Sequence, residues 1–333
     1  MMYLLRLRRY AAGIVLLTLS SLMAAPAAAD ALPRVRVGVL KFGTVNWELD
    51  VIKRRGLDKA EGIDLEIVEL GGKNATAVAL QGGAVDVIVT DWIWVSRQRA
   101  DGADYTLVPH SLATGGLIAR PDAGIRGIAD LRGRKLGIAG GPVDKSWLLL
   151  RAYAKKKLGE DLSAVVEPTF GAPPLLNELM LKGDLPAALN FWHYGARLKA
   201  AGMTEVITVA DMLPELGIES APPLLGWVFS EKWAGGDNSG IQGFLRASLA
   251  AKGILATSDG EWDGLRGAMK ADDDATFEAL RRDYRAGIPA SYKASDVAAA
   301  EKLFETLAEL GGNELVGESR TLSEGTFWAG FTF

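Results

Sequence analysis

Short apolar runs rich in β-branched residues recur along the chain, and longer segments with apolar residues at helical spacing follow many of them. Runs of the first kind are typical of strands, and the longer periodic segments indicate helices. Strand followed by helix, several times over, is the pattern of parallel βαβ units, so the sequence predicts an α/β fold with mostly parallel sheets. The predicted strands cover residues 34–40, 63–68, 84–89, 105–110, 116–119, 165–169, 187–191, 206–209 and 226–229, and residues 127–138 restart the pattern.

The stretch 84–94 shows the pattern most clearly. Its apolar run ends at Thr90 and Asp91, and a segment of helical character follows. In open α/β sheets the residues just beyond the carboxyl end of a strand line the ligand crevice. Asp91 and one of the two tryptophans, Trp92 or Trp94, are therefore candidate binding residues. The structural alternative is that Asp91 only caps the helix and that the tryptophans belong to the core.

Four strand-to-helix junctions of this kind would converge in such a fold, at residues 44–47, 90–94, 140–147 and 190–194. Each junction contains a tryptophan, and each opens a helix whose free N–H groups favour polar or anionic acceptor atoms. The sequence therefore predicts a ligand site at these junctions. Its candidate residues are Thr44, Asn46, Trp47, Thr90, Asp91, Trp92, Asp144, Trp147, Asn190, Trp192 and His193.

The tryptophans of these junctions could clamp a planar or cationic ligand by stacking, at about 0.5 to 2 kcal/mol for each contact. Trp92 and Trp94 would lie about 200° apart on a helix, so only one of them can face the cleft. We choose Trp92, which is nearer the strand end, and predict that it faces Trp192 across the cleft. Trp47 and Trp147 are further candidates, and any one of these rings could instead be core material.

The carboxylates and the small number of histidines limit which ligands and which reactions the site could support. Glu48, Asp91 and Asp144 would suit ammonium, amidine or ring N–H donors. His110 and His193 are the only imidazoles, and the sequence contains neither a Gly-x-Ser-x-Gly elbow nor a His-Glu-x-x-His run. The sequence therefore predicts no catalytic centre, no metal site and no cofactor.

The first residues have the organisation of an export signal. Three arginines form a charged n-region, residues 11–24 an apolar h-region, and Ala27-Ala28-Ala29 a small-residue cleavage site. We therefore expect residues 1–29 to be a signal peptide, and the mature protein to begin at or near Asp30 as a soluble periplasmic protein.

Composition excludes several classes of partner and site. The chain has 37 Lys and Arg residues, and the leader contains three of them, so 34 basic residues remain against 41 acidic ones, a formal charge of −7. This balance argues against nucleic acid or an anionic membrane as a partner. There is no cysteine, so disulfides, thiolate metal sites and cysteine nucleophiles are excluded. A mature chain of roughly 300 residues exceeds the usual size of one core, which favours two lobes.

Four segments, residues 35–38, 56–66, 80–86 and 130–137, resemble in order and spacing the periplasmic substrate-binding proteins of ABC importers. The group in question includes the nitrate, sulfonate and taurine binders and the binders of thiamine-related pyrimidines. The resemblance implies a type II periplasmic binding fold, in which two lobes close by a hinge over one small-molecule site. It also implies delivery of the ligand to an ABC importer permease in the inner membrane, and we expect a monomer.

The order of the segments predicts that one lobe is interrupted by the other. After the signal peptide, residues 30–115 would form the first part of lobe 1, residues 116–222 lobe 2, and residues 223–333 the return strand and C-terminal helices of lobe 1. The chain would then cross between the lobes twice, near 113–120 and 218–228.

Two departures from the group bear on the ligand. Members often have an acidic residue after the tryptophan that ends the second-lobe strand, whereas His193 follows Trp192 here. Oxyanion binders tend to have hydroxyl residues where residues 142–147 read Pro-Val-Asp-Lys-Ser-Trp. We therefore expect a heterocyclic, cationic or zwitterionic compound rather than a simple oxyanion. Two alternatives remain: an exported lyase, hydrolase or pyrimidine-synthesis-like enzyme on the same fold, and a sensory binding protein that feeds a receptor.

Overall fold

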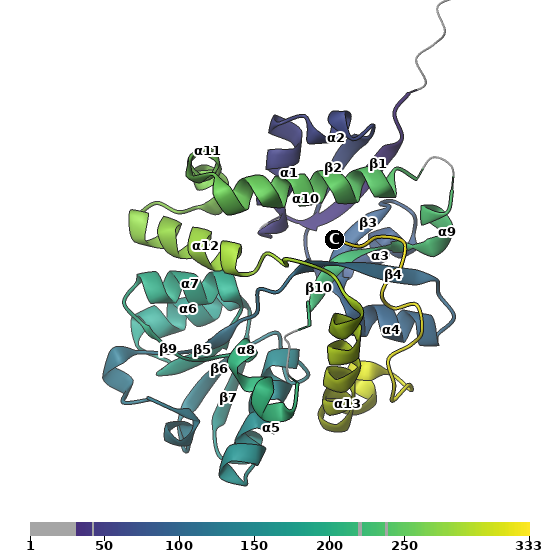
Figure 1. Cartoon of the computed structure of the whole chain (residues 1–333). Coiled ribbons are helices and arrows are strands. Elements are labelled where there is room, and N and C mark those ends of the chain that lie inside the picture. The colour runs from purple at the N-terminus through teal and green to yellow at the C-terminus, as the bar shows by residue number, and fades with distance from the viewer. Residues whose placement is uncertain (1–30, 42, 219–221, 237–238) are drawn as a thin grey trace, which may run out of the picture. The chain divides into compact units, whose positions relative to one another are not determined.

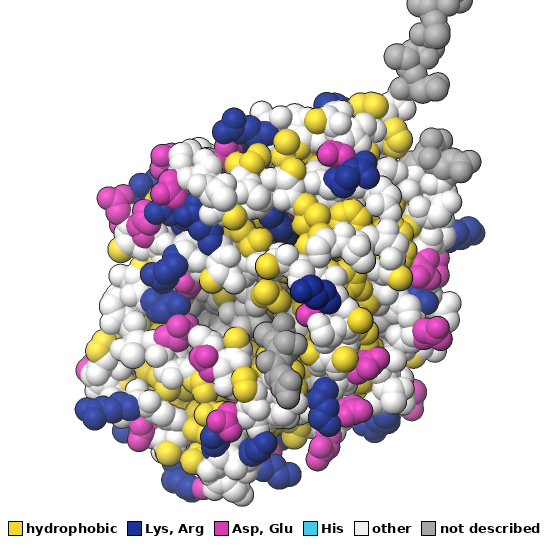
Figure 2. All heavy atoms as spheres, in the orientation of Figure 1, with side chains coloured by type: hydrophobic (Ala, Val, Ile, Leu, Met, Phe, Trp, Pro, Cys, Tyr) yellow, Lys and Arg dark blue, Asp and Glu magenta, His cyan; other side chains and the backbone are white. Residues whose placement is uncertain are grey.

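A computed structural model describes residues 31–41, 43–218, 222–236 and 239–333, so the predicted signal peptide lies outside the described residues. The described chain contains two five-stranded sheets, each flanked by helices (Figure 1). Each sheet with its helices forms one lobe, which confirms the predicted two-lobed α/β fold. No helix within the described ranges is long and apolar enough to cross a bilayer. Acidic and basic side chains are interspersed over the face drawn in Figure 2.

The sheet of lobe 1 has the strand order β2-β1-β3-β10-β4. Strand β1 pairs in parallel with β2 and β3, whereas β10 is antiparallel to both of its neighbours, β3 and β4. The sheet is therefore mostly parallel, with one reversed strand that returns from lobe 2. Its strands are β1 (Arg34–Leu40), β2 (Asp64–Leu70), β3 (Val87–Asp91), β4 (Tyr105–Ser111) and β10 (Leu225–Ser230).

Alternate side chains of this sheet enter two apolar layers, one on each face. Trp227 and Phe229 of β10 enter the first layer, and Val228 between them enters the second. The first layer includes residues of α1 (Val45–Arg54), α2 (Leu57–Ala60), α9 (Glu231–Ala234), α10 (Ile241–Thr257), α11 (Asp259–Met269) and α12 (Asp274–Ala286). The second includes residues of α3 (Lys73–Gln81), α4 (Trp92–Ala100) and α13 (Ala294–Val316).

The sheet of lobe 2 repeats this arrangement with the order β7-β6-β8-β5-β9, in which β5 is antiparallel to β8 and β9. Its strands are β5 (Gly116–Ala119), β6 (Lys135–Ala139), β7 (Glu167–Gly171), β8 (Ala187–Asn190) and β9 (Thr204–Thr208). Ile138 packs with α5 on one face, and Ala188 packs with α6 and α7 on the other. The helices of this lobe are α5 (Lys145–Leu158), α6 (Pro173–Lys182), α7 (Trp192–Ala200) and α8 (Val209–Met212).

The chain passes from lobe 1 to lobe 2 between β4 and β5, and it returns between α8 and β10. Part of the return, residues 219–221, lies outside the described residues. Membership of the strands in the two sheets supports the division 30–115, 116–222 and 223–333, which we retain as a proposal.

Gly115, in the first crossing segment, lies against the backbone at the end of β8. A Cβ atom at this position would lie 1.9 Å from the carbonyl oxygen of Asn190, which is backbone and cannot rotate away. We expect Gly115→Ala to lower the free energy of unfolding by about 1 to 3 kcal/mol, because one of the two backbones must shift. Urea denaturation measures the change.

The matched control is Gly253→Ala in α10, where an added Cβ meets no atom within 4 Å. Because alanine favours an exposed helix interior, this variant should gain about 0.5 to 1 kcal/mol. A Gly115→Ala protein as stable as the wild type would contradict the close approach.

Candidate functional site

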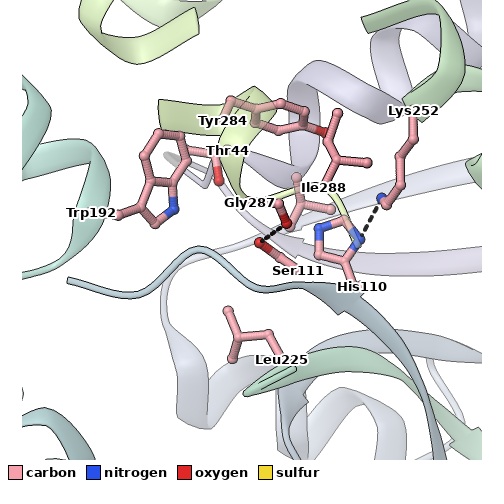
Figure 3. A pocket seen from close by; sticks show the side chains of 10 residues that line it. Thr44, His110, Ser111, Trp192, Leu225, Lys252, Tyr284, Gly287 and Ile288 are labelled. Atoms are coloured by element: carbon pink, nitrogen blue, oxygen red, sulfur yellow. Dashed lines mark hydrogen bonds between the residues drawn. The ribbon is translucent and has the colours of Figure 1, made fainter. Parts of the chain in front are cut away.

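A small cavity lies between the lobes, beside the carboxyl ends of β1, β4 and β8. Trp192 from α7 is its wall on the lobe 2 side, and the other lining residues come from lobe 1. Figure 3 shows Trp192 on one side and His110 with Lys252 on the other. The free volume is about 30 Å³, which holds one or two water molecules at most. Its lining residues are Thr44, Val45, His110, Ser111, Trp192, Leu225, Lys252, Tyr284, Gly287 and Ile288.

Local periodicity brings the polar residues to this cavity. In α10 the buried positions include Phe244, Ser248, Ala251 and Leu255, so helical spacing places Lys252 on the buried face. The ammonium group therefore ends inside the protein, with only 4% of the residue exposed. A lysine in this position needs acceptor atoms close by.

Glu48 of α1 supplies the first acceptor and is fully buried. One of its carboxylate oxygens accepts a hydrogen bond from the Lys252 ammonium and another, at 3.2 Å, from the Tyr284 hydroxyl. The Ser248 hydroxyl donates to the other oxygen and itself accepts from the Trp227 indole N–H at 3.0 Å. Both carboxylate oxygens thus have donors, which a buried carboxylate requires.

His110 at the end of β4 supplies the second acceptor. Its Nδ1 lies 2.9 Å from the Lys252 Nζ and 3.7 Å from the nearer Glu48 oxygen. Burial, together with the positive charge of Lys252, holds the pKa of His110 well below its ordinary value. Burial likewise lowers the pKa of Lys252, and the Glu48 carboxylate opposes this effect. Burial and then the same carboxylate raise the pKa of Tyr284 well above the usual phenol value.

Aromatic rings close the cavity from the lobe 2 side. The Trp192 ring meets Trp47 edge to face, with centroids 6.0 Å apart, and its centroid lies 6.2 Å from that of Tyr284. Trp47 and Tyr284 contact each other at 5.8 Å. Since Trp47 and Tyr284 belong to lobe 1, this cluster joins the two lobes directly above the buried polar groups.

A second contact between the lobes is electrostatic. Asp91 caps α4 by accepting from the Trp94 amide, and its other oxygen lies 2.6 Å from Lys73 and 3.5 Å from Lys145 of lobe 2. Burial alone would raise the pKa of Asp91, yet the charges of Lys145 and Lys73 hold that pKa far below its ordinary range. Asp144, next to Lys145, caps α5.

Further contacts join α7 to the C-terminal helices of lobe 1. The Arg197 guanidinium donates to the carbonyl oxygens of Met269 and Lys270, at 2.6 and 3.1 Å. Lys199 forms an ion pair with Asp283 of α12 at 2.9 Å. The structure thus shows the lobes in contact around the cavity.

The predicted site residues fall into separate groups. Thr44, Trp47 and Trp192 meet at the cavity, and Asp91 and Asp144 meet around Lys145. The expected pair of Trp92 and Trp192 is wrong, because Trp192 meets Trp47 instead.

Trp92 is fully buried in lobe 1, with its ring centroid 6.3 Å from those of both Phe304 and Phe327. It therefore belongs to the core formed with α13 and the C-terminal segment. Trp94, which we set aside, packs on Tyr105.

The remaining predicted residues are held by neighbours in their own lobes. Trp147 is buried in the core of lobe 2, and Thr90 is buried within β3. Asn190 donates to the Pro173 carbonyl and to Asn177.

Two polar predicted residues keep a buried atom without a partner. Asn46 donates to the Leu40 carbonyl, while its Oδ1 has no partner. His193 lies half-buried beside Trp192, its Nδ1 lacks a partner, and burial followed by the charge of Arg197 lowers its pKa to about 4.

Sequence reasoning missed Ser111, Lys252 and Tyr284, and it considered His110 only as a catalytic imidazole. A signal for Lys252 was present, since a lone lysine at i+4 from Ser248 on an otherwise apolar helix face indicates a buried cation. No comparable local signal marks its partner, because Glu48 lies 204 positions away.

A second hollow lies wholly in lobe 2, beyond the carboxyl ends of β6, β7 and β8. Its volume is about 390 Å³, and it is lined by Gly140, Gly141, Phe170, Gly171, Ala172, Pro173 and Phe191. None of these described lining residues carries a charge. Within the described ranges, no group of three or more Asp, Glu, His or Cys residues is placed to hold a metal ion.

Comparison with models of known protein families shows to which family the chain belongs. The family model described as NMT1/THI5 like matches residues 51–256, more than half of the chain. The chain belongs to the NMT1/THI5-like family. No curated protein sequence matches it.

Solved structures share the fold of this NMT1/THI5-like chain. The aliphatic sulphonate binding protein SsuA of Escherichia coli is 18% identical with a TM-score of 0.71, over 89% of this chain and 92% of that one. The alkanesulfonate-binding SsuA of Xanthomonas axonopodis pv. citri, bound to MOPS, is 17% identical with a TM-score of 0.67, over 90% and 99%. The nitrate-binding protein NrtA of Synechocystis PCC 6803 is 12% identical with a TM-score of 0.56, over 80% and 72%.

Removing one partner of the buried ion pair beneath the cavity should strongly destabilise this NMT1/THI5-like chain. Lys252→Met removes the short ion pair of the Glu48 carboxylate and leaves only His110, 3.7 Å away, to supply a compensating charge, so we expect it to lower the free energy of unfolding by about 3 to 5 kcal/mol. The double variant Glu48→Gln/Lys252→Met removes both charges and should recover most of that loss. Urea denaturation at neutral pH measures both variants.

Lys302→Met is the control, because Lys302 pairs with Glu305 on the exposed face of α13 and should be nearly neutral. A double variant as unstable as Lys252→Met would contradict the ion pair as the cause.

Proposed function

We propose that the protein is an exported solute-binding protein that captures a small organic molecule between its lobes and delivers it to an ABC importer permease. The supporting observation is the cavity in which Trp192 of lobe 2 closes over Tyr284 and the Lys252–His110 pair of lobe 1. A site that needs residues from both lobes is complete only when they meet, as expected for a protein that closes over its ligand.

Ligand entry requires the lobes to separate. Small-molecule sites typically enclose about 300 to 1,000 Å³, whereas this cavity has about 30 Å³. The crossing segments between β4 and β5 and between α8 and β10 are the places where a hinge can act. A ligand that contacts Trp192 and His110 together then favours a ligand-filled closed state over the open one.

The charges at the cavity argue against a simple oxyanion as the ligand. Lys252 is the only cationic side chain among the lining residues of the described cavity, and Glu48 already balances its charge. A buried oxyanion would have no further cation to pair with, which is costly. Trp192 and Tyr284 offer ring faces and edges for stacking, and Thr44 and Ser111 offer hydroxyl groups. We therefore propose a heterocyclic, cationic or zwitterionic ligand.

The proposal differs in ligand from the structural relatives, whose names state alkanesulfonate and nitrate binding. It includes cleavage of residues 1–29, a periplasmic location and a monomeric state. Enzymatic activity and delivery to a receptor are the competing roles. Recovery of the bound compound unchanged after long incubation would speak against an enzyme.

A thermal-shift screen of the mature protein tests the ligand class. The panel contains taurine, methanesulfonate, nitrate, pyrimidines, flavins and quaternary amines. We expect a heterocyclic or quaternary compound to raise the melting temperature, because a ligand that binds only the folded state adds RT ln(1 + [L]/Kd) to its stability. A larger shift from nitrate or methanesulfonate would overturn the proposed class.

Replacement of Trp192 tests the site. Trp192→Ala should weaken binding of the best compound in that screen by about 5- to 150-fold, or 1 to 3 kcal/mol, since half of the aromatic wall is lost. Titration of intrinsic fluorescence or calorimetry measures it. Trp94→Ala is the matched control, because Trp94 is also half-buried but packs on Tyr105 of lobe 1 and is not among the residues that line the cavity. This variant should bind with wild-type affinity. Equal affinities for all three proteins would place the ligand elsewhere.

A further inference from the structure

The hydrogen-bonding state of His110 is determined by its neighbours. Protonated lysine carries only donors, and the Lys252 Nζ lies between two acceptors, a Glu48 oxygen and the His110 Nδ1 at 2.9 Å. A ring nitrogen that accepts a hydrogen bond carries no hydrogen of its own. With Lys252 protonated in its ion pair with Glu48, the single ring hydrogen of a neutral His110 is therefore on Nε2.

Nε2 is the ring nitrogen on the cavity side. Figure 3 shows it turned away from Lys252, toward Ser111 and the side on which Trp192 lies. The ring itself is fixed, because Trp227 packs against it with centroids 4.6 Å apart and His110 is only 5% exposed. The His110 ring therefore presents one hydrogen-bond donor to the cavity, in a fixed direction.

We infer that His110 is a specificity-determining residue that presents Nε2–H to the ligand as a fixed donor, and that Lys252 and Glu48 are positioning residues that hold this tautomer. The inference rests on the proposed function and narrows its ligand. The compound must place an uncharged acceptor, such as a ring nitrogen or a carbonyl oxygen, opposite Nε2–H. Ordinary histidines exchange tautomers and titrate near neutral pH, and this one should do neither.

The groups around His110 support a neutral ring. Lys252 of α10 opposes a second positive charge, while Glu48 of α1 at 3.7 Å favours one. Tyr284 of α12 binds Glu48 and stays protonated, and Trp227 of β10 is uncharged. Because Lys252 already pairs with the Glu48 carboxylate, a proton on His110 would add a second positive charge that no anion balances.

Nitrogen NMR of the mature protein labelled with ¹⁵N-histidine tests the tautomer without any ligand. The chain has only two histidines, so the His193→Gln variant leaves His110 as the single imidazole. We expect the pure neutral Nε2–H form, unchanged from about pH 7.5 to about pH 5.5, a range in which free histidine titrates. An Nδ1–H form, a mixture of tautomers or protonation within this range would overturn the inference.

Two variants test the positioning role by the same signal. In Lys252→Met, Glu48 loses its cation and His110 should become protonated in its place, with a pKa at or above the ordinary value. In Glu48→Gln/Lys252→Met neither charge remains, so His110 should be neutral with mixed tautomers. The double variant preserves the test if the single one does not fold. A pure Nε2–H form in the double variant would overturn the positioning role. Lys302→Met should leave the signal unchanged.

Three small probes at equal millimolar concentration test recognition: pyrimidine, which has neutral ring acceptors, benzene, which has none, and nitrate, an anionic acceptor. Pyrimidine should shift the His110 Nε2–H signal, and benzene and nitrate should not. An equal shift from nitrate, or none from pyrimidine, would overturn the inference. A compound from the thermal screen whose binding is weakened by Trp192→Ala, but which does not move the Nε2–H signal, would also overturn it, yet would leave the proposed function standing. Absence of binding by every compound in that screen would instead remove the proposed function.

Discussion

The buried carboxylate of Glu48 is the constraint on which the arrangement of lobe 1 depends. An unpaired carboxylate in a protein interior costs several kcal/mol, so its donors must be in place whenever the protein is folded. Those donors are Lys252 and Tyr284, which lie 204 and 236 positions further along the chain. The helices α10 and α12 must therefore return from beyond lobe 2 and pack on α1. That return also builds the polar wall of the cavity, so one ion pair serves the fold and the site together.

Polar and apolar contacts have different places in the interface between the lobes. The ion pairs of Lys145 with Asp91 and of Lys199 with Asp283 join the lobes away from the lining of the cavity, whereas the Trp192 cluster lies at the cavity itself. Closing also buries apolar side chains, since Ala196 of α7 belongs to an apolar layer of lobe 1. Ion pairs need their directions matched, and apolar contacts need only proximity. Together they define one closed arrangement that leaves space for little more than water.

The sequence predicted the elements and the lobes because strand alternation and helix periodicity are local properties. It also placed Asp91 and Trp192 correctly at strand ends. It could not show that β10 inserts between β3 and β4, since strand order depends on pairing between distant segments. The prediction that Trp192 faces Trp92, when it in fact contacts Trp47, failed for the same reason. Phe304 and Phe327, both far along the chain, cover the Trp92 ring and make it core.

A crystal structure with the compound that gives the largest thermal shift tests the central claim most directly. The account predicts that this compound lies between the lobes, with its ring against Trp192 and an uncharged acceptor within hydrogen-bond distance of His110 Nε2. The cavity would then be larger than its present volume of about 30 Å³, with Trp192 displaced from Trp47. A compound found instead in the hollow of lobe 2 between Gly140 and Phe191, with the cavity unchanged, would contradict the account.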